Sequence, residues 1–175
     1  SARAEAVQAW FATHIPDGPV SVVFHPASFG KHGHFGGDDA SRASAFVEFA
    51  NDPRLDAVWF ARGGYGSCRI AEAVLPRLTG VARKKRYLGY SDAGSLLAGL
   101  YKAGFPHVAH GPMASDAVRR DETAWRAVNW LVSGDAASLE PSLADDPRPA
   151  VAFNLSILDA LVGTYLEPDL SGHVL

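Results

Sequence analysis

Short apolar runs alternate along this chain with segments whose apolar residues recur at helical spacing. The apolar runs, typical of β-strands, cover residues 20–25, 56–61, 87–89 and 106–110. The segments with helical spacing, typical of helices that bury one face, cover residues 2–13, 38–50, 71–78, 93–101 and 120–133. Strands that alternate with helices form βαβ units, because parallel strands need a long crossover connection. The sequence therefore predicts an α/β fold, a parallel sheet flanked by helices on both faces.

The composition fits a globular core and argues against several classes of protein. The chain has 175 residues, of which 47% are hydrophobic, enough for one sizeable core. It contains no apolar run of about eighteen residues and no N-terminal secretion signal. A formal charge of −3 argues against a nucleic-acid partner, and the single cysteine, Cys68, excludes an internal disulfide and a cysteine-based zinc site. We expect a cytoplasmic protein with no nucleic-acid or membrane partner.

The segment Gly89-Tyr90-Ser91-Asp92-Ala93 carries the strongest functional signal. A serine on a sharp strand-to-helix turn is lifted clear of the sheet. It also faces the free N–H groups of the helix's first turn, which can stabilise an oxyanion. This arrangement is a nucleophile elbow, here in the form G-x-S-x-A rather than G-x-S-x-G. The alternative is a plain helix cap, because Ser and Asp are also favoured N-cap residues.

Two further turns follow predicted strands and should lie at the same edge of the sheet as Ser91. They cover residues 62–66 and 110–113. Ligands of open parallel sheets bind outside the carboxyl ends of the strands, which favours a functional interpretation of all three turns. The glycine-rich turn at 62–66 departs from a dinucleotide fingerprint, because Arg69 stands at the third glycine position. It is either a simple tight turn or an oxyanion or substrate-binding turn that faces Ser91.

Histidines offer two other hypotheses. His25, His32 and His34, with acidic Asp38 and Asp39 nearby, could form a metal site. No rigid element fixes their spacing, so we interpret this segment as a solvated loop and expect no metal and no cofactor. His110 follows the predicted strand at 106–110 and could serve as a general base, but a structural or substrate-lining role is favoured.

Several motifs in a fixed order resemble one family of serine peptidases. They are Gly36–Arg42 (G-x-D-x-x-R), Asp52-Pro53, Arg62-Gly63-Gly64-Tyr65-Gly66, Gly89-Tyr90-Ser91-Asp92, His110-Gly111-Pro112, Asn154–Leu158 and Leu161–Thr164. In this order the motifs resemble the LD-carboxypeptidases, or muramoyltetrapeptide carboxypeptidases, a family that includes the microcin C immunity peptidases. The resemblance spans roughly residues 36–175.

The resemblance implies a division of the chain. Residues 1–135 would form a Rossmann-like or flavodoxin-like N-terminal domain that carries the nucleophile. Residues 136–150, rich in Asp, Pro, Ser and Ala, are predicted to form a linker. Residues 151–175 would begin a second, truncated domain, opening with a helix that turns Leu155, Leu158, Leu161 and Val162 inward.

The resemblance also implies an activity and the residues that carry it. Ser91 would be the nucleophile of a Ser-His-Glu triad, with the backbone N–H groups of Asp92 and Gly64 forming the oxyanion hole. Substrate-binding residues would be Arg62, Gly63, Tyr65 and His110. The substrate would be murein tetrapeptide, which loses its terminal D-alanine during cell-wall recycling. The enzyme would be a metal-free, cytoplasmic homodimer.

The chain departs from the family pattern in ways that limit what it can do alone. The family's His and Glu belong beyond the counterpart of Leu175, and neither Glu167 nor His173 lies in a matching motif. The family's first strand is also absent. We therefore expect a fragment that is inactive by itself, since a serine without its base is a weak nucleophile. The alternatives are a microcin-immunity-type peptidase and a non-catalytic murein-peptide-binding protein.

Overall fold

A computed structural model describes residues 1–16, 18 and 20–175 and has a three-stranded parallel sheet at its centre. The strands are β1 (Ala57–Trp59), β2 (Arg86–Gly89) and β3 (Val108–His110), in the order β1-β2-β3. Val58 pairs with Tyr87 and Leu88 pairs with Ala109, both in parallel register. The predicted α/β fold with a parallel sheet is confirmed.

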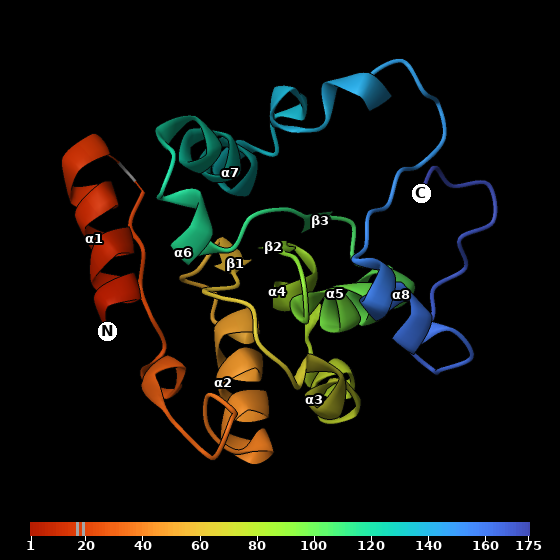
Figure 1. Cartoon of the computed structure of the whole chain (residues 1–175), viewed down its shortest axis with the longest axis horizontal. Coiled ribbons are helices and arrows are strands. Elements are labelled where there is room, and N and C mark those ends of the chain that lie inside the picture. The colour runs from red at the N-terminus through yellow and green to blue at the C-terminus, as the bar shows by residue number, and fades with distance from the viewer. Residues whose placement is uncertain (17, 19) are drawn as a thin grey trace.

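Helices cover both faces of the sheet (Figure 1). The α-helices are α1 (Ala2–His14), α2 (Asp39–Asn51), α3 (Ser67–Val74), α4 (Gly80–Arg83), α5 (Ala93–Lys102), α6 (Ala114–Ala117), α7 (Asp121–Ser133) and α8 (Leu155–Leu161). Short 3₁₀ helices are η1 (Pro26–Phe29), η2 (Leu75–Arg77), η3 (Ala136–Ser138) and η4 (Pro141–Leu143). In Figure 1, α1, α6 and α7 lie on one side of the strands and α2, α3 and α5 on the other. The chain therefore has the layered arrangement that its alternating pattern predicts.

The central strand β2 joins the two halves of the core. Leu88 packs with the buried residues of α1 and α7, among them Trp10 and Val128. Its neighbour Tyr87 has no exposed surface and packs on the opposite side with Leu97 and Leu100 of α5. Successive strand residues point to opposite faces, so a two-sided core requires a strand that is apolar throughout. Burying a leucine in this way stabilises the fold by about 1.5–3 kcal/mol.

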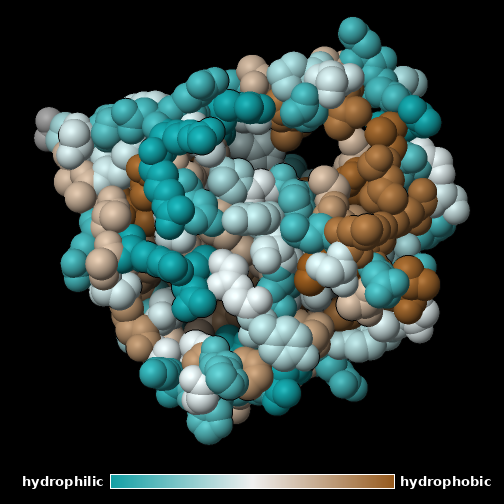
Figure 2. All heavy atoms as spheres, in the orientation of Figure 1, coloured by the Kyte–Doolittle hydropathy of each residue, from teal (hydrophilic) through white to brown (hydrophobic). Residues whose placement is uncertain are grey.

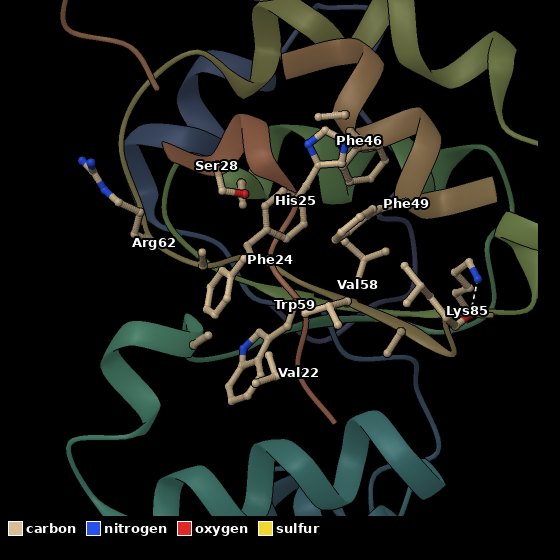
Figure 3. A pocket seen from close by; sticks show the side chains of 18 of the residues that line it. Val22, Phe24, His25, Ser28, Phe46, Phe49, Val58, Trp59, Arg62 and Lys85 are labelled. Atoms are coloured by element: carbon tan, nitrogen blue, oxygen red, sulfur yellow. Dashed lines mark hydrogen bonds between the residues drawn. The ribbon is translucent and has the colours of Figure 1, made fainter. Parts of the chain in front are cut away.

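The segment at residues 20–25, predicted as a buried strand, is not a strand in the structure. Val20, Val22 and Phe24 pack against the α1–α7 cluster, whereas Val23 is 54% exposed, so the segment keeps the alternation of a strand. Within the described residues, none of positions 20–24 forms a backbone–backbone hydrogen bond. The segment and β1 both line a cavity of about 1050 Å³, where Figure 3 shows the Val22 and Phe24 side chains close to Trp59. The prediction failed because a strand needs a neighbour at pairing distance as well as an alternating pattern.

Two helices bury faces that differ from the predicted ones. In α7 the apolar spacing of Trp125, Val128, Leu131 and Val132 predicts one inward face. The structure buries Val128, Leu131 and Trp130 but leaves Trp125 and Val132 38% and 48% exposed. In α8 only Leu161 is fully buried, while Leu155 and Val162 are 81% and 62% exposed. Figure 2 shows hydrophobic surface on the side of the molecule where α8 lies.

The stretch from 136 to 150 contains η3 and η4 and is mostly exposed, but the domain boundaries stay predictions. None of the helices built by the described residues combines the length and apolar character needed to cross a membrane.

Candidate active site

Ser91 lies on the sharp turn between β2 and α5, with a backbone conformation that few serines adopt. Its φ is +57°, and it is the one non-glycine residue in the described ranges with a positive φ. A non-glycine residue in this left-handed region costs about 1–3 kcal/mol and persists where the surroundings enforce it. Neither Ser91 nor Asp92 caps α5 with its side chain, so the helix-cap alternative does not describe this turn. The geometry is that of a nucleophile elbow.

Two glycines keep the space around Ser91 open, Gly89 at the end of β2 and Gly63 in the glycine-rich turn. A Cβ built on Gly89 would lie 2.9 Å from Phe60 Cδ2, so the end of β2 requires glycine there. A Cβ built on Gly63 would lie 3.4 Å from Ser91 Oγ. The structure thus brings Gly63 of the glycine-rich turn against the candidate nucleophile, as expected for a turn that faces Ser91.

The two turns that meet at Ser91 carry backbone N–H groups without a partner. Within residues 1–16, 18 and 20–175, the backbone N–H groups of Gly63, Gly64 and Asp92 form no intramolecular hydrogen bond. Donors without an intramolecular partner can stabilise a developing oxyanion when they lie beside the reacting carbon. The predicted oxyanion donors, Asp92 and Gly64, are therefore available.

The Asp92 side chain ties the two turns together. Its carboxylate accepts hydrogen bonds from Gly66 N–H at 3.0 Å and from Ser67 N–H at 2.9 Å, at the N-terminus of α3. The Ser67 hydroxyl donates in return to the Asp92 carbonyl oxygen. An anion at a helix N-terminus is favourable because the first N–H groups of a helix have no partners within it. Asp92 thereby fixes the 62–66 turn relative to Ser91.

The G-x-D-x-x-R segment supports the same turn from outside. Arg42 Nη1 donates to the Gly66 carbonyl oxygen at 3.1 Å, and the same guanidinium pairs with Asp39. Asp39 also accepts from Arg69 Nε at 2.8 Å. The hydrogen bonds from Arg69 and Arg42 hold the pKa of Asp39 below its ordinary value. Arg69, the residue that breaks the dinucleotide fingerprint, is thus part of the support of this turn.

Two of the predicted substrate-binding residues, Arg62 and Tyr65, have exposed side chains. Arg62 Nε donates to the Gly63 carbonyl oxygen at 3.0 Å, so its side chain folds back on its own turn. Tyr65 is 67% exposed, and its ring centroid lies 5.9 Å from that of Phe35. Both side chains are accessible at the rim of the site.

His110 ends β3 and pairs in register with Gly89, beside the elbow. Its ring centroid lies 6.1 Å from that of Tyr90, whose hydroxyl donates to Asp116 at 3.0 Å. His110 as a whole is exposed, yet desolvation of its imidazole lowers the pKa of that ring, while a weaker influence of Asn154 raises it. His110 is therefore biased toward the neutral form.

Asn154 also contacts the elbow, a role that its sequence position does not predict. The Ser91 N–H donates to Asn154 Oδ1 at 2.9 Å, across 63 positions of sequence. The sequence signal for this contact was only the presence of Asn154 in one of the ordered motifs. Nothing in its spacing from Ser91 indicates the contact, which depends on where α8 packs.

Comparison with known protein families identifies the family of this chain. A family model described as the LD-carboxypeptidase N-terminal domain matches residues 2–111. This chain belongs to the LD-carboxypeptidase family. The match includes the glycine-rich turn, the elbow and the end of β3, so the recognition made from the ordered motifs is confirmed.

Two curated relatives and one solved structure are similar over most of this LD-carboxypeptidase chain. The protein named "Putative carboxypeptidase slr1534", from Synechocystis sp., is 26% identical over 160 residues, which cover 88% of this chain and 52% of that protein. The "Probable murein peptide carboxypeptidase" of Bacillus subtilis is 28% identical over 160 residues, covering 83% of this chain and 49% of that protein. The chain thus spans about half the length of these relatives.

The crystal structure of muramoyltetrapeptide carboxypeptidase from Oxalobacter formigenes matches with a TM-score of 0.65 and 21% sequence identity. The match covers 94% of this chain and 57% of that one. At this identity the likeness establishes the shared fold.

The large cavity of this LD-carboxypeptidase chain only touches the site. The segment at 20–25 and β1 line much of it, as Figure 3 shows for Val22, Phe24, Val58 and Trp59. Its lining also includes Arg62, Gly64 and Asp92. Ser91 is not among its lining residues. The cavity belongs chiefly to the apolar layer beside the sheet.

The histidine-rich loop lies outside the elbow. His25 Nε2 lies 3.2 Å from Glu48 Oε2, and its Nδ1 accepts a hydrogen bond from Ala27 N–H. In the part of the chain that the structure describes, no group of three or more His, Cys, Asp or Glu residues could hold a metal ion.

Proposed function

We propose that this chain is the nucleophile-bearing half of a serine carboxypeptidase that releases D-alanine from the C-terminus of murein tetrapeptide. The observation that carries the proposal is Ser91 itself, held at a positive φ on a strand-to-helix turn with Gly63 against its hydroxyl. A strained serine at the carboxyl end of a parallel strand is typical of an acyl-transfer nucleophile.

The first half of the reaction forms an ester on Ser91. Its Oγ attacks the carbonyl carbon of the terminal amide while its proton passes to a general base. The carbonyl oxygen becomes an oxyanion, stabilised by the N–H groups of Asp92 and Gly64. The C–N bond then breaks, the proton returns to the leaving nitrogen, and D-alanine departs.

The second half restores the enzyme. Water gives a proton to the same base as its oxygen attacks the ester carbon, and a second oxyanion forms in the same place. The ester bond breaks, Ser91 Oγ recovers its proton, and the shortened peptide leaves as a carboxylate.

We propose that the base and its orienting carboxylate come from beyond Leu175. Two contacts support this proposal. The His173 imidazole lies 2.7 Å from the Tyr101 hydroxyl, and the Glu167 carboxylate accepts a hydrogen bond from Gly163 N–H. Both side chains are thus engaged away from Ser91.

Exposed groups at the rim fit a small anionic peptide. The Arg62 guanidinium is accessible and could form a charge-assisted hydrogen bond with the terminal carboxylate of the substrate. Tyr65 and His110 supply an aromatic surface and a neutral donor or acceptor beside it. The name of the Bacillus subtilis relative supports a murein peptide as the substrate. Homodimer formation and a cytoplasmic location stay predictions.

The decisive experiment measures D-alanine release from murein tetrapeptide by the full-length protein and by its Ser91→Ala variant. Release by the parent alone supports the reaction and the nucleophile. Release by both would remove Ser91 from the mechanism. Release by neither would favour the microcin-immunity-type substrate or the binding protein, and labelling of Ser91 by a serine-directed fluorophosphonate separates these two.

A further inference from the structure

A side chain from the far end of the chain holds the backbone of the candidate nucleophile. Asn154 precedes α8, yet its Oδ1 accepts the hydrogen bond of Ser91 N–H at 2.9 Å. Ser91 has a φ of +57°, a conformation that an L-residue keeps only when something enforces it. The Asn154 carboxamide is positioned to do so, because it fixes the direction of the Ser91 peptide plane.

The same side chain leaves its own helix uncapped. Asn154 occupies the N-cap position of α8, where asparagine is among the preferred residues because its oxygen can accept an N–H of the first turn. No such side-chain bond forms here. The oxygen is committed to Ser91 instead, so local helix stability does not explain the placement of this side chain.

Packing between α8 and α5 sets the position of Asn154. A Cβ built on Gly94, in the first turn of α5, would lie 3.2 Å from Ile157 Cγ2. Leu161 is 2% exposed and packs in the same cluster as Leu96. These contacts anchor α8 beside the elbow, while Asn154 itself is exposed and adds little to the core.

We propose that Asn154 is a positioning residue that makes the elbow competent only when the segment after residue 150 is docked. This proposal rests on the proposed function of Ser91 as nucleophile. Hydrolysis then depends on a contact between the α/β layers and the start of the C-terminal segment.

Amide hydrogen exchange at Ser91 in the full-length protein tests the contact without requiring activity. Asn154→Ala removes the acceptor and should speed exchange at Ser91 N–H by about tenfold. Asn154→Asp keeps an acceptor oxygen and should retain the slow exchange. Ser156→Ala, an exposed neighbour on α8, is the matched control and should change nothing. Equal exchange rates in the wild type and Asn154→Ala would overturn the proposal, as would equal rates in the alanine and aspartate variants.

Kinetics test the consequence for the reaction. Asn154→Ala should lower kcat for D-alanine release by about 10-fold to 100-fold with little change in KM, because the nucleophile is misplaced while the binding groups remain. An unchanged kcat in a variant of an active enzyme would overturn the positioning role and leave the proposed function intact. If the wild type releases no D-alanine, the proposed function fails, and the exchange experiment still decides whether Asn154 holds Ser91.

Discussion

Asp92 accepts two hydrogen bonds from Ser67. The Ser67 backbone N–H donates to the Asp92 carboxylate, and the Ser67 hydroxyl donates to the Asp92 carbonyl oxygen. Asp92 follows the candidate nucleophile at the start of α5, and Ser67 opens α3 directly after the glycine-rich turn. Neighbouring strands place the starts of these two helices at the same edge of the sheet. The two hydrogen bonds between Ser67 and Asp92 fix the position of one helix start relative to the other. The candidate oxyanion donors lie on the two sides of this link.

Asp92→Ala should loosen the link while leaving the Asp92 backbone N–H in place. The first N–H groups of α3 lose their acceptor, so the free energy of unfolding should fall by about 1–2 kcal/mol, the usual cost of losing a cap. Activity of the full-length protein should fall as well, because Gly63 and Ser91 are no longer held together. Chemical denaturation and D-alanine release measure the two effects. Asp159→Ala, which changes an exposed aspartate of α8, is the control, and equal behaviour of the two variants would contradict the link.

Ser91→Gly and Ser91→Ala should both abolish hydrolysis but differ in stability. At a φ of +57° glycine carries no steric penalty, whereas alanine keeps the strain of serine. We expect the glycine variant to exceed the alanine variant by about 1 kcal/mol in the free energy of unfolding. Urea denaturation of the two proteins checks this. A glycine variant less stable than the alanine variant would mean that the elbow is not strained.

Gly63→Ala should lower the activity, whereas Gly89→Ala should lower the stability. The new methyl group at residue 63 would touch Ser91 Oγ at 3.4 Å, an ordinary contact distance that nonetheless occupies space beside the nucleophile. We expect lost activity and nearly unchanged stability. The methyl group at residue 89 would lie 2.9 Å from Phe60 in the core, and overpacking of this kind costs about 1–3 kcal/mol.

Thermal denaturation and D-alanine release distinguish the two glycine variants. Gly36→Ala is a suitable control, since a Cβ there meets no atom within 4 Å. If Gly63→Ala kept full activity, the glycine-rich turn would not border the reacting carbonyl.

The elements that local pattern determines were predictable from the sequence, and those that depend on a distant partner were not. The elbow follows from a short apolar run, a glycine and a helix within a few residues, so Ser91 could be found directly. The segment at 20–25 has the alternation of a strand, but within the ranges that the structure describes its positions 20–24 form no backbone–backbone hydrogen bond. The contact between Ser91 and Asn154 arises only when α8 packs on α5, which no spacing in the sequence records.

Amphipathic faces show the same limit on a smaller scale. In α7 two tryptophans stand five positions apart, and the structure buries Trp130 at 8% exposure while leaving Trp125 at 38%. Either tryptophan could belong to the buried apolar face of α7. Packing against the sheet and α1 determines which of the two is buried. Indeed, Trp125 contacts Trp10 of α1 edge-on instead of entering the core below it.

Protonation of His110 should destabilise the fold below about pH 6.5. Desolvation lowers the pKa of this histidine in the folded protein from its ordinary value of 6.5, so the unfolded chain binds the proton more readily. Stability rises with pH wherever the unfolded state holds more protons, so the contribution of neutral His110 is complete above pH 6.5 and is lost as the pH falls toward the folded-state pKa. His110→Gln removes this titration but keeps a polar side chain. Denaturation midpoints at about pH 5.5 and 7.5 should therefore differ less in the variant than in the wild type. The same pH dependence in both proteins, or an imidazole NMR titration at or above 6.5, would contradict a desolvated His110 beside the elbow.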